Sequence, residues 1–287
     1  MRLRDFIKLA RPRDWLKNVF VLMPVPFALA AGGHLEPVTF LLGVAALSLT
    51  SSAVYALNDT LDAERDRLHE KKRERPIAAG RISKAEALVF AAALLAAGFG
   101  LAALSGSGVA LLVIGAYVAK ELLYQLGLKH VPLVDVFLLS SGFVLRVVLG
   151  AELVGTAPSN WLLLVSSTLA LFISLAKRRG ELARGMDGAH RPALDGYTVP
   201  YLDQALAVTA GMILISYALY CMDAKVLLGG REFASLPFVV FGVLEYMRLA
   251  QVRGEGGSPI DLLFASPALI VCGVGWTVAS LWSVGLP

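Results

Sequence analysis

Long apolar segments separated by short polar ones make up most of this chain. A run of roughly 20 apolar residues is long enough for a helix to cross a bilayer. We expect about nine such spans, at about Val19–Ala31, Pro37–Leu57, Ala85–Leu104, Gly108–Leu126, Val131–Val154, Trp161–Ala176, Gln204–Met222, Phe233–Ala250 and Ile260–Val284. The first is short and contains Pro24 and Pro26, and the eighth is also irregular. The pattern predicts an all-α, polytopic membrane protein.

Composition supports this class and excludes several others. Hydrophobic residues make up 57% of the 287 positions and charged residues only 17%, and the mean hydropathy is +0.69. Soluble domains rarely have this balance. Cys221 and Cys272 lie far apart in apolar runs, so neither a disulfide framework nor a metal site is indicated. The chain lacks phosphate-loop, HExxH and zinc-type motifs, and we expect no nucleic-acid partner.

Basic residues are distributed unevenly between the two sides of the predicted spans. They collect in residues 1–18, which we expect to form an amphipathic interfacial segment, and in the loops after the even-numbered spans. The opposite side holds only Lys225 and Arg231. By the positive-inside rule the N-terminus is cytosolic. We therefore predict one membrane domain over residues 1–287, with catalytic loops at 58–84 and 177–203 on the cytosolic side.

The loop after the second span carries the clearest chemical pattern. Asp59, Asp62 and Asp66 recur at spacings of three and four, so on a continuing helix they share one face. Like charges on one face repel unless a cation lies between them, and carboxylates are the ligands that a hard divalent ion prefers. We expect these groups at a wet helix end. The alternative is a solvated loop that only fixes topology.

Basic residues follow these acids closely and suit phosphate oxygens. The candidate phosphate-binding residues of this loop are Asn58, Lys71, Lys72, Arg73 and Arg75, with His69 as a further hydrogen-bond donor. Acids for a metal ion beside bases for phosphates, at a membrane surface, indicate chemistry on a diphosphate.

Other polar residues are expected at the same rim. Lys17 and Asn18 stand at the entrance to the first span; Tyr124, Lys129 and Asp135 surround the loop between the fourth and fifth spans; Lys177, Arg178 and Tyr197 belong to the loop after the sixth. We assign these residues to substrate binding, with Lys129 at the reacting centre. The lysines could instead extend their charged ends to the membrane interface without binding substrate. The basic residues after the sixth span could instead only fix the topology.

Lys120, Glu121 and Arg146 are charged residues inside the predicted spans. Lys120 and Glu121 are adjacent and are expected to neutralise charge within the bundle. Arg146 lies about 20 Å beyond the predicted cytosolic rim. We expect a structural role for Arg146 near Glu152, remote from diphosphate chemistry.

Several sequence blocks resemble a known family. NDTLDAERD is similar to the NDxxDxxxD motif of the UbiA-type intramembrane prenyltransferase superfamily. RPRDWLKNVFVLMPVPFA, NDTLDAERDRLHEKKRERPIAAGRIS, LKHVPLVDVFLLSSGFVLRVVLGAE and SLAKRRGEL together resemble its decaprenyl-phosphate phosphoribosyltransferase branch. These blocks span Arg11 to Leu182; the last three spans resemble the family only in hydropathy.

The resemblance implies a fold, a reaction and a location. It implies about nine helices around a central lipid-accessible cavity, in the plasma membrane of a bacterium. Phosphoribosyl diphosphate would be the donor and a polyprenyl (decaprenyl) phosphate the acceptor, for lipid-linked pentose and cell-wall glycan synthesis. Asp59, Asp62 and Asp66 would bind Mg²⁺ on the diphosphate. Classical members carry a second DxxxD motif after the sixth helix, and this chain has KRRGE there.

Two other functions are compatible with the sequence. One is a classical aromatic prenyltransferase that uses a prenyl diphosphate donor and has a degenerate second motif. The other is a non-enzymatic lipid transporter or scaffold. The charged residues argue against this function, because they cluster at one face rather than along a path across the membrane. Homo-oligomerisation stays open.

Overall fold

The computed structural model describes residues 2–68, 72–188, 191–223, 225–252, 262 and 266–285. All regular structure in this part of the chain is helical, as predicted. The long helices are α3 (Pro37–Leu61), α5 (Lys84–Leu104), α6 (Gly108–Gln125), α7 (Val134–Glu152), α8 (Asn160–Ala183), α9 (Val199–Asp223), α10 (Leu236–Val252) and α12 (Pro267–Ser283). The shorter ones are α1 (Arg2–Ala10), η1 (Pro12–Val21), α2 (Val25–Ala30), α4 (Ala63–Arg67), η2 (Lys72–Glu74), η3 (Leu128–His130) and η4 (Pro192–Gly196).

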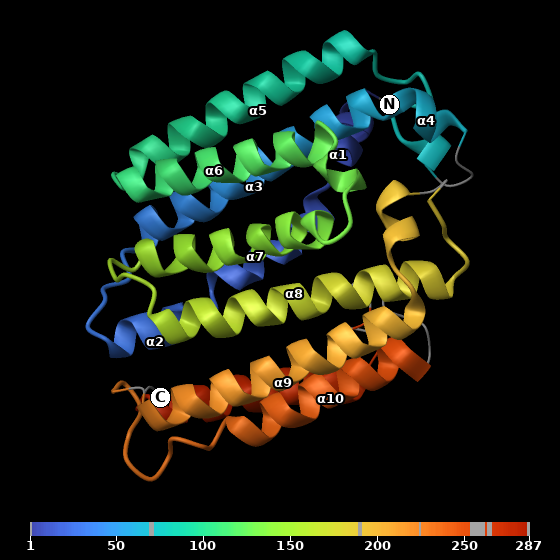
Figure 1. Ribbon diagram of the computed structural model, residues 1–287. Helices are drawn as coiled ribbons and strands as arrows, with labels where there is room; N and C mark the ends of the chain where they lie inside the picture. The colour runs from blue at the N-terminus through green and yellow to red at the C-terminus, as the bar shows by residue number, and fades with distance from the viewer. Residues whose placement is uncertain are drawn as a thin grey trace.

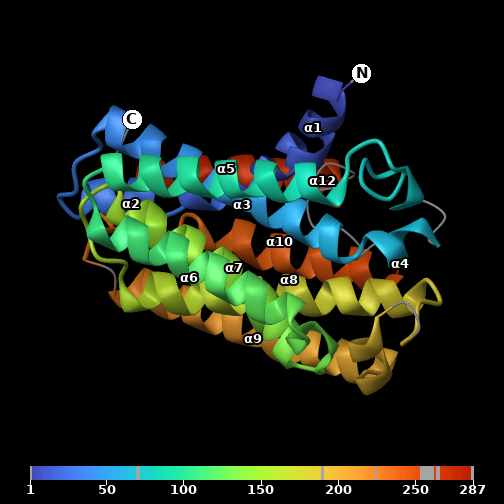
Figure 2. The ribbon, with the colours of Figure 1, turned by 90° about the horizontal axis from the view of Figure 1, so that it is seen from above.

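The long helices run side by side along one bundle direction (Figures 1 and 2), and the two marked chain ends lie at opposite ends of the bundle. Within the described residues, six helices are long and apolar enough to cross a membrane: α3, α5, α6, α7, α8 and α9. The predicted eighth and ninth spans appear as α10 and α12, of 17 residues each.

The predicted first span has an unexpected form. Residues 12–21 make a 3₁₀ helix, η1, which is followed by the six-residue α2. A 3₁₀ helix rises about 2 Å per residue, so η1 covers about 20 Å, and α2 adds about 9 Å. The end of η1 lies inside the bundle, where Val21 packs against Gly150 of α7; that residues 1–18 form an interfacial segment stays a prediction.

Local capping signals fix where several helices begin. The Ser83 side chain accepts a hydrogen bond from the backbone N–H of Glu86, and the Glu86 carboxylate accepts one from the backbone N–H of Ser83, which forms a capping box at the start of α5. The side chains of Ser107, Ser159 and Ser266 each accept a hydrogen bond from a backbone N–H in the first turn of α6, α8 and α12. Such caps satisfy N–H groups that have no partner inside the helix.

Small residues bring the helices close together. A Cβ at Gly98 of α5 would lie 2.3 Å from Oγ1 of Thr50 on α3, so this pair of helices is in backbone-level contact, as is common in membrane bundles. Among the described residues, the two largest apolar cores lie on either side of α7. One joins α2, α3, α6 and α7, and the other joins α7, α8, α9 and α10.

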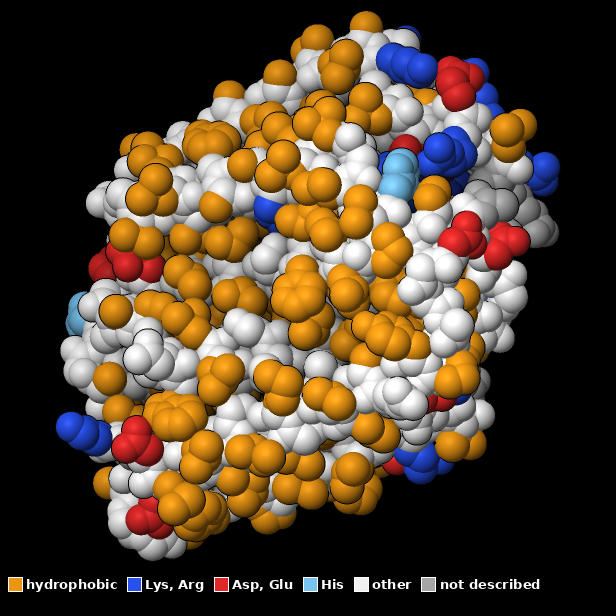
Figure 3. All heavy atoms as spheres, viewed as in Figure 1, with side chains coloured by type: hydrophobic (Ala, Val, Ile, Leu, Met, Phe, Trp, Pro, Cys, Tyr) orange, Lys and Arg blue, Asp and Glu red, His pale blue; other side chains and the backbone are white. Residues whose placement is uncertain are grey.

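The outer surface of the bundle is apolar. Leu41, Val89, Leu112 and Ile215 are all more than 60% exposed, and in Figure 3 hydrophobic side chains cover the middle of the visible face while charged ones gather toward its edges. A soluble monomer rarely exposes so much apolar surface. The fold is that of a polytopic membrane protein.

Candidate active site

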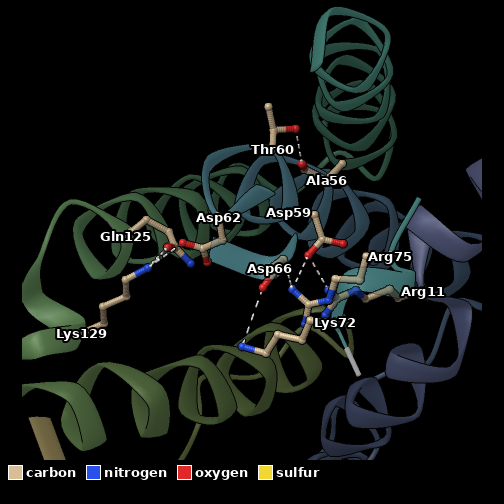
Figure 4. A network of polar contacts seen from close by, with 10 residues as sticks. All are labelled: Arg11, Ala56, Asp59, Thr60, Asp62, Asp66, Lys72, Arg75, Gln125 and Lys129. Atoms are coloured by element: carbon tan, nitrogen blue, oxygen red, sulfur yellow. Dashed lines mark hydrogen bonds and ion pairs between the residues drawn. The ribbon is translucent and has the colours of Figure 1, made fainter. Parts of the chain in front are cut away.

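The acid-rich loop begins with a break in the helix at Asp62. Helix α3 ends at Leu61, and α4 begins at Ala63. The expected continuing helix is therefore wrong, and Asp62 points toward Lys129 while Asp59 points toward Arg75 (Figure 4). The described residues contain no cluster of three acidic, histidine or cysteine side chains arranged around one metal position.

Two of the three acids share an arginine. Arg75 Nη1 lies 2.9 Å from Oδ1 of Asp59 and 2.6 Å from Oδ2 of Asp66. Arg11 adds a contact of 2.5 Å to the same Asp59 oxygen. Both carboxylates are buried, at 2% exposure, so the expectation of a wet helix end is wrong for Asp59 and Asp66. They belong to a mixed-charge cluster, and Asp66 also lines the polar cavity next to it.

Asp62 faces an open polar cavity of about 140 Å³. Its carboxylate lies 3.4 Å from Nζ of Lys129, and Lys129 also donates to the Gln125 side chain at 2.7 Å. The cavity is lined by Asp62, Arg65, Asp66, Lys72, Tyr124, Gln125, Lys129, His130, Arg191 and Pro192. Acids and bases from three separate loops thus meet around one space that can hold a phosphorylated ligand.

Two basic groups of the cavity have lowered pKa values. Burial, and then the neighbouring Arg75, lower the pKa of Lys72 below its usual range. Burial, and then Lys129, lower the pKa of His130. The His130 Nε2 atom is buried without a hydrogen-bond partner. Both shifts report a site in which positive charge is crowded, so an anionic ligand would be favoured there.

The loop before α9 contributes a side chain that the sequence prediction missed. Arg191 donates to the Tyr124 hydroxyl at 2.6 Å and lies 3.5 Å from the Glu181 carboxylate. Arg11, Arg65 and Gln125 were also absent from the predicted site. A signal existed for Arg11, which begins the family-like RPRDWLKN block; Arg191 is one of many basic loop residues and carries no distinguishing local pattern.

Asp135, Arg178 and Tyr197 do come together, but away from the open cavity. Arg178 Nε lies 2.6 Å from Oδ2 of Asp135, and both side chains are completely buried. The Tyr197 hydroxyl donates to Oδ1 of Asp135 at 2.7 Å and accepts from the backbone N–H of Leu133. Burial, and then the bond to Asp135, raise the pKa of Tyr197. Arg178 also pairs with Glu181, so this cluster supports the loop that carries Arg191.

Lys17 and Asn18 lie on η1 and do not line the polar cavity. Lys17 pairs with Asp14 at 2.6 Å, and the Asn18 amide donates to the Ser48 hydroxyl at 2.8 Å. Arg146 Nε donates to Oδ1 of Asn18 at 2.9 Å. The expected neighbour of Arg146 was wrong, because Glu152 instead accepts a hydrogen bond from Ser107.

The remaining predicted residues occupy varied positions. Arg73 is exposed, and Lys177 is half-buried on α8. The backbone carbonyl of Asn58 accepts from the N–H of Asp62 at 2.9 Å. Lys120 and Glu121 form the expected ion pair, at 2.5 Å. Lys71 and His69 lie outside the described residues.

Known proteins share both sequence and fold with this chain. The model of the UbiA prenyltransferase family matches residues 18–253. A decaprenyl-phosphate phosphoribosyltransferase of Corynebacterium glutamicum is 35% identical over 97% of this chain and 86% of that protein. One of Mycobacterium tuberculosis is 32% identical over 94% of this chain and 91% of that protein. A UbiA homolog from Archaeoglobus fulgidus bound to GPP and Mg²⁺ superposes with a TM-score of 0.76 at 19% identity, over 98% of this chain and 100% of that one. The chain belongs to the UbiA prenyltransferase family.

Proposed function

We propose that this protein transfers the phosphoribosyl group of phosphoribosyl diphosphate to decaprenyl phosphate or a similar polyprenyl phosphate and releases diphosphate. The observation that carries the proposal is the near full-length similarity to phosphoribosyltransferases of decaprenyl phosphate. The polar cavity beside Asp59, Asp62 and Asp66 is independently suited to a phosphorylated donor.

Asp59 and Asp66 fit a magnesium ion. One nitrogen of Arg75 touches both carboxylates, so their nearest oxygens are no more than about 5.5 Å apart. Opposite ligands of magnesium are about 4 Å apart. A small closure of the two side chains, with Arg75 turning away, would let both bind one ion. When bound, Mg²⁺ would neutralise the leaving diphosphate.

The reaction then needs little proton chemistry. The bond between the anomeric carbon and the diphosphate oxygen breaks, and an oxygen of the acceptor phosphate forms the new bond to that carbon. The acceptor is already ionised, so it requires orientation rather than a general base. Arg75, once released from the acids, and Lys72 are placed to hold the departing diphosphate. Lys129 and Arg191 would orient the donor from the other side of the cavity.

The region that replaces the second acidic motif favours this reaction over aromatic prenylation. In KRRGE, Arg178 and Glu181 pair with each other, and Arg178 also holds Asp135. Glu181 is therefore engaged in an internal ion pair and is a poor candidate for a second metal site.

We also propose an orientation for the active site. The residues around the polar cavity lie at the same end of the bundle as α1 and α4 (Figure 1). The basic residues of the connecting loops gather there, which by the positive-inside rule places this end in the cytosol. Phosphoribosyl diphosphate is soluble and would enter from that side, while the acceptor keeps its apolar tail in the membrane.

A transfer assay with two substrate pairs tests the proposal. Purified protein is incubated with Mg²⁺ and either ribose-labelled phosphoribosyl diphosphate and decaprenyl phosphate, or a labelled prenyl diphosphate and an aromatic acid. We expect label to move into the lipid phase, as a phosphoribosylated lipid, only with the first pair. Product from the second pair alone would establish an aromatic prenyltransferase, and product from neither would favour a non-enzymatic role.

A further inference from the structure

Two cations meet inside the bundle, beyond the polar cavity. Lys120 projects from α6 and Arg146 from α7, and their side chains converge at Gly142. A Cβ at Gly142 would lie 2.7 Å from Nζ of Lys120 and 3.4 Å from Nη1 of Arg146, so the two nitrogens are within about 6 Å of each other. Both cations also lie over the Tyr117 ring, at 5.1 and 5.2 Å from its centre. Like charges at this distance repel, and glycine makes their approach possible.

Protein groups neutralise only one of these two charges. Glu121 pairs with Lys120 at 2.5 Å. Among the described residues, Arg146 has no carboxylate within ion-pair distance; it donates to the Asn18 side chain and to the carbonyl of Gly142. Arg146 is only 5% exposed. A buried charge is costly unless it is paired, so this cluster would be stabilised by an anion.

A donor nitrogen and a phenol adjoin this cluster. In the part of the chain that the structure describes, Arg146 donates hydrogen bonds through Nε and Nη1 and none through Nη2. The Tyr55 hydroxyl interacts electrostatically with Arg146 and with Tyr117. Arg11 and Lys17 lie over the Tyr55 ring, at 5.1 and 5.8 Å from its centre. Tyr55 precedes Asp59 by one turn of α3, about 6 Å. The cluster therefore adjoins the acids of the candidate active site.

We propose that Lys120, Arg146 and the Tyr55 hydroxyl form a subsite for a phosphomonoester dianion. The inference rests on the proposed function, because both of its substrates carry such a group: the 5-phosphate of the donor and the head of the polyprenyl phosphate. A phosphomonoester offers the acceptor oxygens and the charge that the cluster lacks. Arg146, expected from the sequence to be structural, becomes a substrate-binding residue.

Binding of phosphorylated fragments tests the subsite without catalysis. Thermal unfolding of the purified protein is followed with EDTA present, so that metal-held diphosphate binding makes no contribution. The probes are ribose 5-phosphate and farnesyl phosphate, with ribose and farnesol as controls. We expect a phosphorylated probe to raise the Tm of the wild-type protein and to have no effect on Arg146→Gln. Equal stabilisation of both proteins would overturn the proposal.

Kinetics then identify the source of the phosphate. Arg146→Gln is expected to raise the KM for one substrate by about ten-fold or more with kcat nearly unchanged, and Arg146→Lys to recover part of the loss. An effect on phosphoribosyl diphosphate assigns the site to the donor, and an effect on the polyprenyl phosphate to the acceptor. Gly142→Ala keeps both charges but displaces Lys120, and should raise the same KM.

The matched control is Arg179→Gln. Arg179 is also a buried arginine, but it is paired with Asp203 at 3.0 Å and donates to the carbonyl of Ala250. Its loss should lower the Tm and leave both KM values unchanged. Unchanged KM values in a folded Arg146→Gln protein would overturn the subsite. Absence of any transfer by the wild-type protein would count against the proposed function alone, because the fragment-binding result still decides the subsite.

Discussion

Replacing Asp135 by alanine should destabilise this protein more than removing one partner of an exposed ion pair. Asp135 and Arg178 are both 0% exposed and lie 2.6 Å apart. The substitution leaves a buried guanidinium with Glu181 as its remaining partner and removes the acceptor of the Tyr197 hydroxyl. Breaking a buried ion pair costs about 3–5 kcal/mol. Because Glu181 stays in place, we expect the lower end, about 3 kcal/mol.

Thermal unfolding in one detergent measures this effect. The expected fall in Tm is about 6 °C or more. The control is Glu64→Ala, which removes the partner of Arg67 in an ion pair whose side chains are 49% and 65% exposed, and this should change the Tm little because exposed ion pairs contribute little to stability. Adding Arg178→Met to Asp135→Ala removes the unpaired charge and should restore part of the loss. A Tm for Asp135→Ala equal to that of the control, or a double variant less stable than Asp135→Ala alone, would refute the reasoning.

Three further predictions concern the cavity. Asp62→Asn should lower turnover by about 100-fold or more and leave Tm unchanged, because the Asp62 side chain is 30% exposed; retained turnover would contradict its role. Lys129→Met should raise the KM for phosphoribosyl diphosphate by about ten-fold, whereas an unchanged KM would remove Lys129 from the donor site. The lowered pKa of His130 means that its stabilising contribution is complete above pH 6.5 and is lost as the pH falls. His130→Gln should therefore weaken the fall in Tm between pH 7 and 5.5, and an identical pH profile would show that His130 is not responsible.

The sequence predicted the helical framework well where the signal is local. Apolar runs of sufficient length locate α3 and α5 through α9, and serines at positions such as 83 and 107 mark where helices begin. The first predicted span was harder to predict. Its prolines indicate an irregular segment, but nothing in the local sequence shows that residues 12–21 form a 3₁₀ helix and pack against α7.

The site was predictable in its residue types and less so in its pairings. The spacing of Asp59 and Asp66 draws attention to this loop, but the helix break at Asp62 and the bridge by Arg75 depend on how the chain returns to α3. Asp135 and Arg178 are 43 positions apart, and their mutual burial has no local signal. The hydrogen bond between Arg146 and Asn18 could not be predicted for the same reason, since the two residues are 128 positions apart.

A magnesium titration of phosphoribosyl transfer tests the central claim most directly. Wild-type protein and Asp59→Asn are compared in the same detergent, at saturating phosphoribosyl diphosphate and decaprenyl phosphate, with Tm measured on the same samples. We predict saturable Mg²⁺ dependence for the wild-type protein, complete loss of transfer in EDTA, and in the folded variant no transfer at any Mg²⁺ concentration that saturates the wild type. Transfer that persists in EDTA, or identical titration curves for the two proteins, would contradict the account.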